Sequence, residues 1–392
     1  MLDSPEFHRA ARIRGLEISE IVQISERAAA RKALGHDVVA LSTGEPDFPT
    51  PEAVIAAAHK AATDGKTRYT PTLGTAELRA AIAADAKARP DQVIVSCGAK
   101  QVIANAMLAT LEAGDEVVMP APFWTSYADI VRMAGGSPVI VSCAMADGFK
   151  LTPAALEAAL TPRTRWLMLN APSNPSGAIY SPAELSALEA VLLRHPQVWV
   201  LSDEIYEHLN FIPFHRLADV APDLRGRLLT VNGVSKAWSM TGWRIGWGIG
   251  PVDLIRAMGA VQGQVTSGAC SIAQAAATAA LTGGTEVLDV RRDAMRARRD
   301  LVVSALDAMP GIECAAPDGA FYVFPRITGA MQAQGHATDA AFCDWLLAEH
   351  DLALVPGRAF GLPGHLRLSF AYAESELQTG LDRLARALNG DT

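Results

Sequence analysis

Short apolar runs recur along the middle of the chain, and the intervals between them carry helix patterns. This alternation is typical of a mostly parallel sheet with helices on both faces, because the strands of such a sheet are buried on both sides. We therefore predict an α/β fold with a mostly parallel central sheet flanked by helices. The predicted strands are Val93–Val95, Glu116–Met119, Pro138–Val141, Trp166–Leu169, Val198–Leu201 and Leu228–Val231.

Three helix starts are marked by a capping residue followed by proline. Ser181, Pro182 and Glu184 have the spacing of a capping box with proline at the first helical position. Thr50-Pro51 and Thr152-Pro153 repeat the pair of cap and proline. We predict that a helix begins at each of these points.

The pattern changes after about residue 285, where an arginine-rich helical stretch leads into shorter apolar runs. This change indicates a smaller α+β domain. We predict that residues 1–48 form an N-terminal arm and part of the small domain, that 49–285 form the large domain, and that 286–392 complete the small one. The short strands predicted here are Phe321–Phe324, Leu352–Val355 and Leu366–Phe370. The arginines expected on the solvated face of the helix are Arg291, Arg292, Arg296, Arg298 and Arg299.

Composition excludes several classes of protein. Half of the 392 residues are hydrophobic and 19% are charged, which excludes a disordered chain, a collagen and a coiled-coil rod. The formal net charge of -8 provides no long-range positive field, so we expect neither nucleic acid nor a membrane surface as a partner. The first twenty residues are charged and lack an apolar core, which predicts a cytoplasmic protein without a signal peptide or membrane anchor.

The cysteines and histidines do not indicate a metal site. The five cysteines are scattered without a CxxC pair, and we expect them to be small apolar residues in a reducing compartment. His208 and His215 are not accompanied by the helical spacing of metal ligands. The glycines of Gly246-Trp-Gly248-Ile-Gly250 lack the spacing of a dinucleotide-binding fingerprint.

Polar residues follow four of the predicted strands, where an open α/β sheet binds its ligands. Gly98-Ala99-Lys100 opens a helix after the first strand, Asp203 and Tyr206 follow the fifth, and Lys236 and Arg244 follow the sixth. Asn170 and Asn174 follow the fourth strand. Taken one at a time, these residues have ordinary explanations: a surface lysine, a helix cap or a structural ion pair. Their combination points to one ligand site.

Pyridoxal 5′-phosphate needs this set of groups. Its aldehyde forms a Schiff base with a lysine, here Lys236, and its pyridine nitrogen needs an acid such as Asp203 to stay protonated. The helix start at Gly98-Ala99-Lys100 and the guanidinium of Arg244 would bind the phosphate. Tyr206 would donate a hydrogen bond to the ring hydroxyl and tune the pKa of the lysine adduct.

The chain resembles, over nearly its whole length, the class I aminotransferases of fold type I, and it is most similar to the bacterial aspartate aminotransferase branch. The resemblance implies a mostly parallel central sheet with a smaller α+β domain built from both termini. The matching stretches are Gly44-Glu-Pro-Asp-Phe48, Lys66-Thr-Arg-Tyr69, Asn174-Pro-Ser-Gly177, Ser202-Asp-Glu-Ile-Tyr206, Ser235-Lys236, Thr241-Gly-Trp-Arg-Ile-Gly246 and Arg367-Leu-Ser369.

The resemblance implies further roles at the cofactor. Asn174 joins Tyr206 at the ring hydroxyl, Trp124 stacks on the ring face, and Ser235 lies among the cofactor contacts beside Lys236. The resemblance also implies a homodimer with shared active sites, in which Tyr69 reaches the phosphate of the neighbouring subunit.

The resemblance likewise implies how an amino acid substrate is bound. Arg367 binds the α-carboxylate beside the backbone of Gly44, and Lys100 with Ser19 recognises a side-chain carboxylate. Trp124 and Asn174 contact the substrate as well as the cofactor. These roles predict ping-pong transfer of an amino group, with aspartate or glutamate as donor and 2-oxoglutarate or oxaloacetate as acceptor. Glu17, near Ser19, would repel the second carboxylate of prephenate and disfavours that substrate.

Several alternatives stay open at this point. The enzyme could prefer aromatic amino acids or prephenate, and the same motifs occur in carbon–sulfur lyases and cyclopropane-forming synthases that use this cofactor. A catalytically silent homologue is a further alternative. A transcription regulator is disfavoured because the resemblance begins near residue 15, which leaves no room for a DNA-binding module.

Overall fold

The computed structural model describes residues 7–390, and its central feature is a seven-stranded sheet. The strand order is β2-β8-β7-β6-β5-β3-β4. β8 (Ile245–Ile249) is antiparallel to both of its neighbours, whereas the other pairs are parallel. All six strands predicted in this region are confirmed. They are β2 (Val93–Cys97), β3 (Glu116–Ala121), β4 (Ser137–Ser142), β5 (Thr164–Asn170), β6 (Trp199–Asp203) and β7 (Leu228–Gly233).

Strand β8 was not predicted, because its glycines hide the strand pattern. Its glycines have a packing role: a Cβ on Gly246 would collide with the backbone of Ala99, and one on Gly248 would lie 2.7 Å from Cγ1 of Val102. Glycine therefore lets β8 lie directly against the helix that begins at Ala99. This close approach helps to place the start of that helix at the edge of the sheet.

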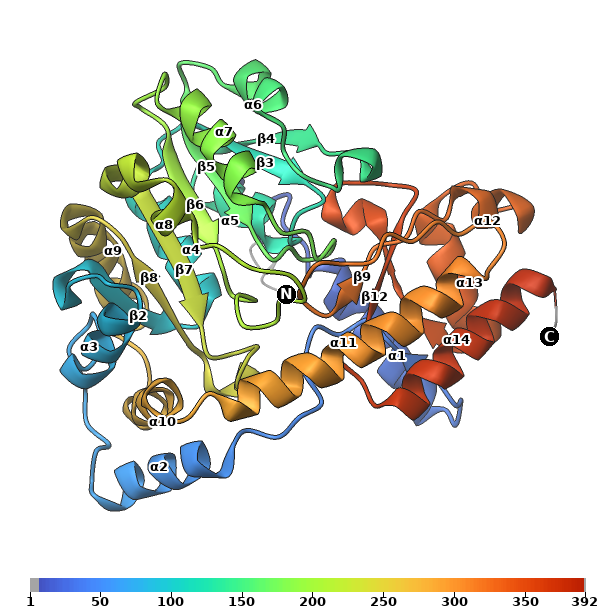
Figure 1. Ribbon diagram of the computed structural model, residues 1–392, viewed down its shortest axis with the longest axis horizontal. Coiled ribbons are helices and arrows are strands. Elements are labelled where there is room, and N and C mark those ends of the chain that lie inside the picture. Colours follow the sequence, from blue (N-terminus) through green and yellow to red (C-terminus); the bar gives the residue numbers. More distant parts are fainter. Residues whose placement is uncertain (1–6, 391–392) are drawn as a thin grey trace, which may run out of the picture.

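Helices cover both faces of the sheet (Figure 1). Side chains alternate between two cores: Trp166 and Met168 of β5 pack on one side, and Leu167 and Leu169 pack on the other. The first core includes α4 (Ala99–Thr110), α5 (Ser126–Met133) and α9 (Val252–Val265). The second includes α6 (Pro153–Ala159), α7 (Pro182–Leu192) and α8 (Leu217–Val220). Packed near β2 and β8 are α2 (Glu52–Thr63), α3 (Ala76–Asp85) and α10 (Ser271–Thr282).

Two of the three predicted helix caps are confirmed. Ser181 and Glu184 form the capping box of α7, and the side chain of Thr152 caps α6. The prediction for Thr50 is wrong, because Pro51 occupies the N-cap position of α2. The Thr50 hydroxyl instead donates a 2.8 Å hydrogen bond to the carbonyl oxygen of Ser239, just after Lys236.

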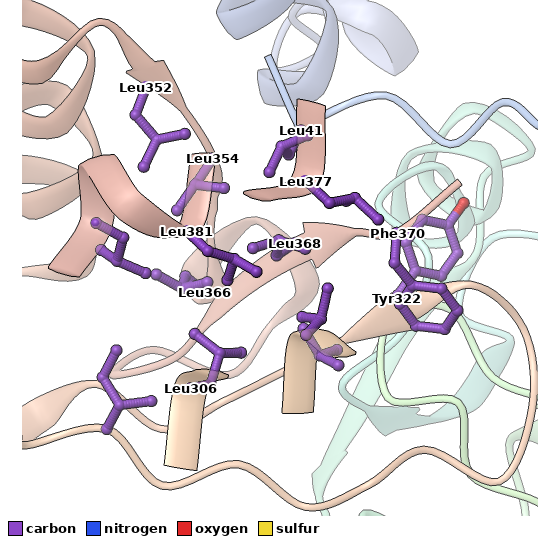
Figure 2. Packing of buried hydrophobic residues seen from close by; sticks show 14 of the residues in the cluster. Leu41, Leu306, Tyr322, Leu352, Leu354, Leu366, Leu368, Phe370, Leu377 and Leu381 are labelled. Carbon is purple, nitrogen blue, oxygen red and sulfur yellow. The ribbon is translucent and has the colours of Figure 1, made fainter. Parts of the chain in front are cut away.

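A smaller layer of strands and helices lies beside the large sheet (Figure 1). β1 (Val39–Ala40) pairs with β10 (Leu352–Ala353), so the small layer combines segments that are far apart in the sequence. β11 (Val355–Pro356), β12 (Leu366–Ser369) and β9 (Tyr322–Val323) form an antiparallel sheet. Leucines of these strands pack with Phe370 and with helix residues into one core (Figure 2). The helices of this layer are α1 (Glu20–Ala33), α11 (Glu286–Asp307), α12 (Thr328–Ala333), α13 (Asp339–His350) and α14 (Glu374–Asn389).

Short 3-10 helices complete the described chain. They are η1 (Ala11–Ile13), η2 (Pro90–Gln92), η3 (Met145–Asp147), η4 (Pro222–Arg227), η5 (Thr241–Trp243) and η6 (Gly357–Phe360). No helix within residues 7–390 is both long and apolar enough to cross a bilayer.

The prediction that the arginines of α11 lie on its solvated face is wrong for Arg291. Its guanidinium is buried and donates hydrogen bonds to the carbonyl oxygens of Ala237, at 2.9 Å, and Pro49, at 2.5 Å. Arg298 pairs with Asp47 at 2.8 Å. Backbone carbonyls from two loops thus satisfy a buried cation, a pattern that charge spacing along the helix does not reveal.

The prediction of small apolar cysteines is also wrong for one position. Cys143 and Cys343 are buried, but Cys270 is exposed at the N-cap of α10. Its place at a helix start, outside the packed turns of α10, explains the difference.

Candidate active site

A cavity of about 300 Å³ contains most of the residues singled out by the sequence. The ends of β5 and β6, the segment that follows β7, the start of α4 and strand β12 all contribute to its lining. The sheet therefore gathers groups that are far apart in sequence, as expected at the carboxyl ends of parallel strands. The predicted residues in the lining are Gly44, Ala99, Lys100, Trp124, Asn174, Asp203, Tyr206, Ser235, Lys236, Arg244 and Arg367.

Lys236 lies three residues after the end of β7 and extends toward the segment that follows β1. Its Nζ donates a 2.7 Å hydrogen bond to the carbonyl oxygen of Gly44. Burial lowers the pKa of Lys236 to about 8, and the positive charges of Arg367 and Arg244 contribute to the decrease. A substantial fraction of this amine is therefore neutral near pH 8, which suits a nucleophile or a general base.

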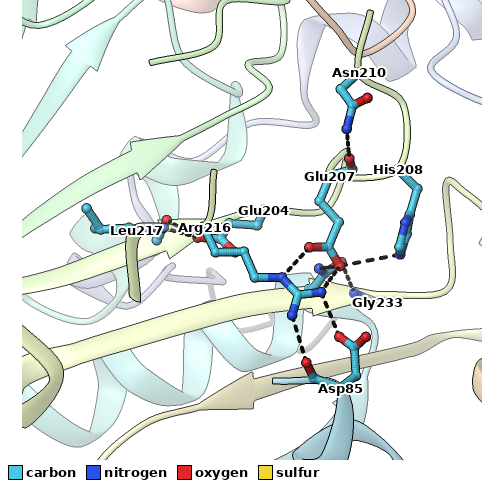
Figure 3. A network of polar contacts seen from close by, with 10 residues as sticks. Asp85, Glu204, Glu207, His208, Asn210, Arg216, Leu217 and Gly233 are labelled. Atoms are coloured by element: carbon cyan, nitrogen blue, oxygen red, sulfur yellow. Dashed lines mark hydrogen bonds and ion pairs between the residues drawn. The ribbon is translucent and has the colours of Figure 1, made fainter. Parts of the chain in front are cut away.

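A network of polar side chains contacts the end of β7 (Figure 3). Glu207 accepts hydrogen bonds from Nδ2 of Asn232, at 2.8 Å, and from Nε of Arg216, at 2.7 Å. Arg216 also pairs with Asp85 of α3 at 2.6 Å. Because Asn232 is the penultimate residue of β7, this network fixes the strand end from which the chain leads to Lys236.

Asp203 is the last residue of β6 and only 4% of it is exposed. Its Oδ2 accepts a 2.5 Å hydrogen bond from the Tyr127 hydroxyl, and its Oδ1 accepts one from the backbone N–H of Ile205. Burial raises the pKa of Asp203 to about 6, although both hydrogen bonds and the charge of Lys236 act in the opposite direction. A buried carboxylate of this kind can hold a proton on a basic nitrogen beside it.

Tyr127 and Tyr322 are cavity residues whose roles the sequence did not indicate. Tyr127 lies on α5, and the need of a buried Asp203 for a hydrogen-bond donor is the signal that could have identified it. The hydroxyl of Tyr322 lies 3.0 Å from that of Tyr206. A Cβ on Gly44 would collide with the Tyr322 hydroxyl, so glycine is required for this close contact.

The start of α4 and Arg244 form a positively charged cradle. Gly98 caps the helix with a φ of 85°, and a Cβ at this position would collide with the Arg244 guanidinium. Arg244 is itself held in a left-handed conformation, and its Nη1 donates to the carbonyl oxygen of Thr241 at 2.7 Å. Nζ of Lys100 lies 4.8 Å from the ring centroid of Trp124. Burial and the charge of Arg244 lower the pKa of Lys100. Free helix N–H groups beside a guanidinium favour an anion such as phosphate.

Arg367 is a second anion site, because it is a buried cation without a carboxylate partner among residues 7–390. It is 1% exposed, which rules out a solvated sheet face. Its Nη1 donates to Oδ1 of Asn174 at 3.1 Å, and its Nη2 donates to the carbonyl oxygen of Ser42. Its Nε has no hydrogen-bond partner within the described chain. A carboxylate that entered the cavity could pair with this guanidinium.

Three predicted site residues lie outside the cavity lining. Gly98 lies beside the lining as the N-cap of α4. Ser19 lines an adjacent groove together with Glu17, while Ile21 of α1 reaches the cavity instead. Tyr69 is 98% exposed and does not reach the cavity of its own chain.

The described residues contain no cluster that suits a metal ion. No group of three or more His, Cys, Asp or Glu side chains with that arrangement occurs between residues 7 and 390. The titratable groups that line the cavity are two amines, one buried carboxylate, three phenols and two guanidinium groups.

Comparisons with known proteins agree with this arrangement. The chain is 48% identical to an aspartate aminotransferase from Rhizobium meliloti, over 97% of this chain and 96% of the relative. It is 50% identical to an aspartate/prephenate aminotransferase from Cereibacter sphaeroides, over 93% and 95% of the two chains.

Solved structures of aspartate aminotransferases share the fold. The structure from Rhizobium meliloti has a TM-score of 0.95 at 48% identity and covers 98% of this chain and 99% of its own. The structure from Thermus thermophilus with maleate has a TM-score of 0.91 at 39% identity, with 97% and 100% covered. The family model for class I and II aminotransferases matches residues 36–384. With this match, these relatives and this cavity, the chain belongs to the class I and II aminotransferase family.

Proposed function

We propose that this aminotransferase uses pyridoxal 5′-phosphate to move the amino group of L-aspartate to 2-oxoglutarate by a ping-pong mechanism. The observation that carries the proposal is the single cavity in which Lys236, Asp203, Arg244 and Arg367 face one another. The names of the relatives from Rhizobium meliloti and Cereibacter sphaeroides support aspartate as a substrate.

The residues present fit the proposed cofactor. The cradle of Gly98 and Arg244 is shaped for an anion, since a Cβ at residue 98 would fill it. Asp203 suits the pyridine nitrogen, and Trp124 lines the cavity where it can pack on the ring. Tyr206 and Asn174 line the same cavity and would bind the ring hydroxyl, and Ser235 adds a hydroxyl beside Lys236.

The chemistry that pyridoxal 5′-phosphate supplies when bound is an aldehyde that bonds covalently to amines and a protonated ring that stabilises negative charge at the substrate Cα. Nζ of Lys236 would hold the cofactor through its aldehyde, and the neutral amine is the base that would accept the proton from the substrate Cα. Asp203 keeps the proton on the ring nitrogen, and Tyr127 orients the Asp203 carboxylate.

Arg367 binds the substrate α-carboxylate through a bidentate, charge-assisted pair. Its contacts with Asn174 and with Ser42 fix the guanidinium before substrate arrives. Because the group is already buried and held in place, little ordering is needed on binding. This arrangement orients Cα toward Lys236.

Lys100 is the cavity residue best suited to the side-chain carboxylate of aspartate. Ser19 lies in the adjacent groove and would assist only if the segment before α1 closed toward the cavity. Prephenate is a second candidate substrate, because the relative from Cereibacter sphaeroides is named for it. Glu17 pairs with Arg9 at 3.2 Å and lies in the groove, so its charge opposes prephenate less than the sequence suggested.

A homodimer with shared active sites completes the proposal. Tyr69 is almost fully exposed, and its hydroxyl would reach the phosphate bound in a second copy of the chain. Amino acids and 2-oxo acids are the other proposed partners.

The test is a panel of amino donors assayed against 2-oxoglutarate with enzyme reconstituted in pyridoxal 5′-phosphate. We expect aspartate to have the highest kcat/KM, and we expect transfer from glutamate to prephenate to be detectable but slower. Lys236→Ala should abolish turnover and the visible absorption band, whereas the exposed control Lys60→Ala should not. Release of pyruvate or ammonia from cystathionine without amino transfer would instead support a carbon–sulfur lyase.

A further inference from the structure

Two fully buried glutamines hold the segment that follows Tyr69. Gln262 of α9 and Gln274 of α10 are both 0% exposed. Their side-chain amides are directed at the connection between α2 and α3, which runs along the outer edge of the molecule in Figure 1. Burying an amide is unfavourable unless its hydrogen-bonding groups are satisfied, so these contacts need an explanation beyond filling the core.

Gln274 spans the segment from one end to the other. Its Oε1 accepts a 2.7 Å hydrogen bond from the backbone N–H of Thr75. Its Nε2 donates to the hydroxyl of Thr70 at 3.1 Å and to the carbonyl oxygen of Ala269 at 2.9 Å. The Gln274 side chain thereby fixes both ends of the segment from Thr70 to Thr75, and Thr70 directly follows Tyr69.

Gln262 ties the middle of the segment to strand β2. Its Nε2 donates to the carbonyl oxygens of Thr72, at 2.5 Å, and Val95, at 2.8 Å. Its Oε1 accepts from the Ser96 hydroxyl and from Nδ2 of Asn105. Strand β2 ends at the anion cradle, so the segment is fixed in the same framework as the start of α4.

Tyr69 contrasts with this anchoring. The next residues are held by buried amides, yet Tyr69 itself is 98% exposed. Because the segment after Tyr69 is rigid, the backbone of Tyr69 has already lost much of its conformational freedom. This lowers the entropy cost of ordering its exposed side chain on binding.

We propose that Gln274, acting through Thr70, is a positioning residue that holds Tyr69 in place for the phosphate of the cofactor bound in a second copy of the chain. Gln262 assists by fixing the middle of the same segment. The inference rests on the proposed function, in which the two active sites of a homodimer share Tyr69. A glutamine with a purely structural role would affect unfolding but not recognition of the phosphate.

The experiment compares the affinity of the apoenzyme for pyridoxal 5′-phosphate and for pyridoxal, which lacks the phosphate, by fluorescence titration. Thr70→Val removes the hydroxyl that accepts from Gln274 and keeps the shape of the side chain. We expect it to weaken the affinity for pyridoxal 5′-phosphate about two- to tenfold and to leave the affinity for pyridoxal unchanged. The matched control is Thr282→Val, at the exposed end of α10, which should change neither affinity.

Three further variants, Tyr69→Phe, Tyr69→Phe with Thr70→Val, and Gln274→Met, separate the possible failures. Tyr69→Phe should weaken the affinity for pyridoxal 5′-phosphate, and adding Thr70→Val to it should cause little further loss because both act through one contact. If Tyr69→Phe weakens binding but Thr70→Val and Gln274→Met do not, or if pyridoxal binding falls equally, the positioning role is overturned. If Tyr69→Phe itself has no effect, the shared active site fails and this inference fails with it.

Discussion

Nζ of Lys236 donates a hydrogen bond to the carbonyl oxygen of Gly44, which joins the end of the large sheet to the segment that follows β1. Gly44 also packs against the Tyr322 hydroxyl so closely that a side chain cannot fit. The Lys236 amine therefore lies between the segment that follows β7 and the segment that follows β1. Its surroundings, rather than the strand that precedes it, determine its pKa.

The pH dependence of cofactor attachment should report the pKa of Lys236. Only the neutral amine attacks an aldehyde, so the rate at which apoenzyme and pyridoxal 5′-phosphate develop a visible band should rise with pH through about 8 and level off above it. Because the charge of Arg367 helps to lower this pKa, Arg367→Gln should move the midpoint to higher pH. Stopped-flow absorbance measures both. A midpoint near that of an ordinary lysine in the wild type would contradict the assignment, and Arg256→Gln on α9 serves as an exposed control.

Asp203 should affect the chemical step more than substrate binding. Asp203→Asn removes the charge that keeps the ring nitrogen protonated, and we expect kcat to fall about 100-fold or more with little change in KM. Tyr127→Phe keeps the carboxylate but removes a hydrogen bond that lowers its pKa, so its effect should be smaller, up to about tenfold. Steady-state kinetics with aspartate would count against this role if Asp203→Asn raised KM and left kcat intact.

Arg367 should affect binding of the α-carboxylate. Arg367→Lys keeps a positive charge but loses the planar pair of donors, so we expect KM for aspartate to rise about 10- to 100-fold. Arg256→Lys, at an exposed arginine that pairs with Asp253, provides the matched control. An equal rise in KM for both variants, or none for Arg367→Lys, would remove Arg367 from the substrate site.

Glu204 should make the protein less stable as the pH rises. Burial and the nearby charge of Glu207 raise the pKa of Glu204 to about 8, and its Oε2 has no partner among the described residues. The folded state therefore holds a proton that the unfolded state releases above about pH 4.5, so the stabilisation is complete at low pH and is lost as the pH approaches 8. Glu204→Gln keeps a neutral side chain at every pH. Urea unfolding from pH 5 to 9 should show a flatter profile for this variant, by on the order of a few kcal/mol.

The prediction for Glu204→Gln can be contradicted by the same measurement. Parallel stability profiles for wild type and Glu204→Gln would mean that Glu204 is ionised throughout and is balanced by Arg216, which lies beside it in Figure 3.

The positions of the strands and of the polar residues that follow them could be predicted, because both depend on the local sequence pattern. The apolar runs gave six strands of the sheet, and the parallel order places Asp203 and Lys236 at one edge. Strand β8 could not be predicted, since the need for glycine there comes from the packing of α4 against it. The division into domains at residues 48 and 285 stays a prediction.

Hydrogen-bond partners that come from separate elements could not be predicted from the local sequence pattern. Tyr127 meets Asp203, and Tyr322 meets Tyr206, only because separate elements pack together. Arg291 was misjudged for the same reason, because its acceptors belong to two distant loops. The placement of Ser19 in a groove beside the cavity likewise depends on how α1 packs.

The pairing of β1 with β10 has a consequence for synthesis on the ribosome. Val39 leaves the ribosome about 310 residues before its partner Leu352. Contacts between such distant positions form slowly, so Val39 and Leu41 stay without their native neighbours for most of that time. The nascent chain is therefore open to misassociation until its last strands arrive, and a chaperone that shields early apolar segments should raise its yield.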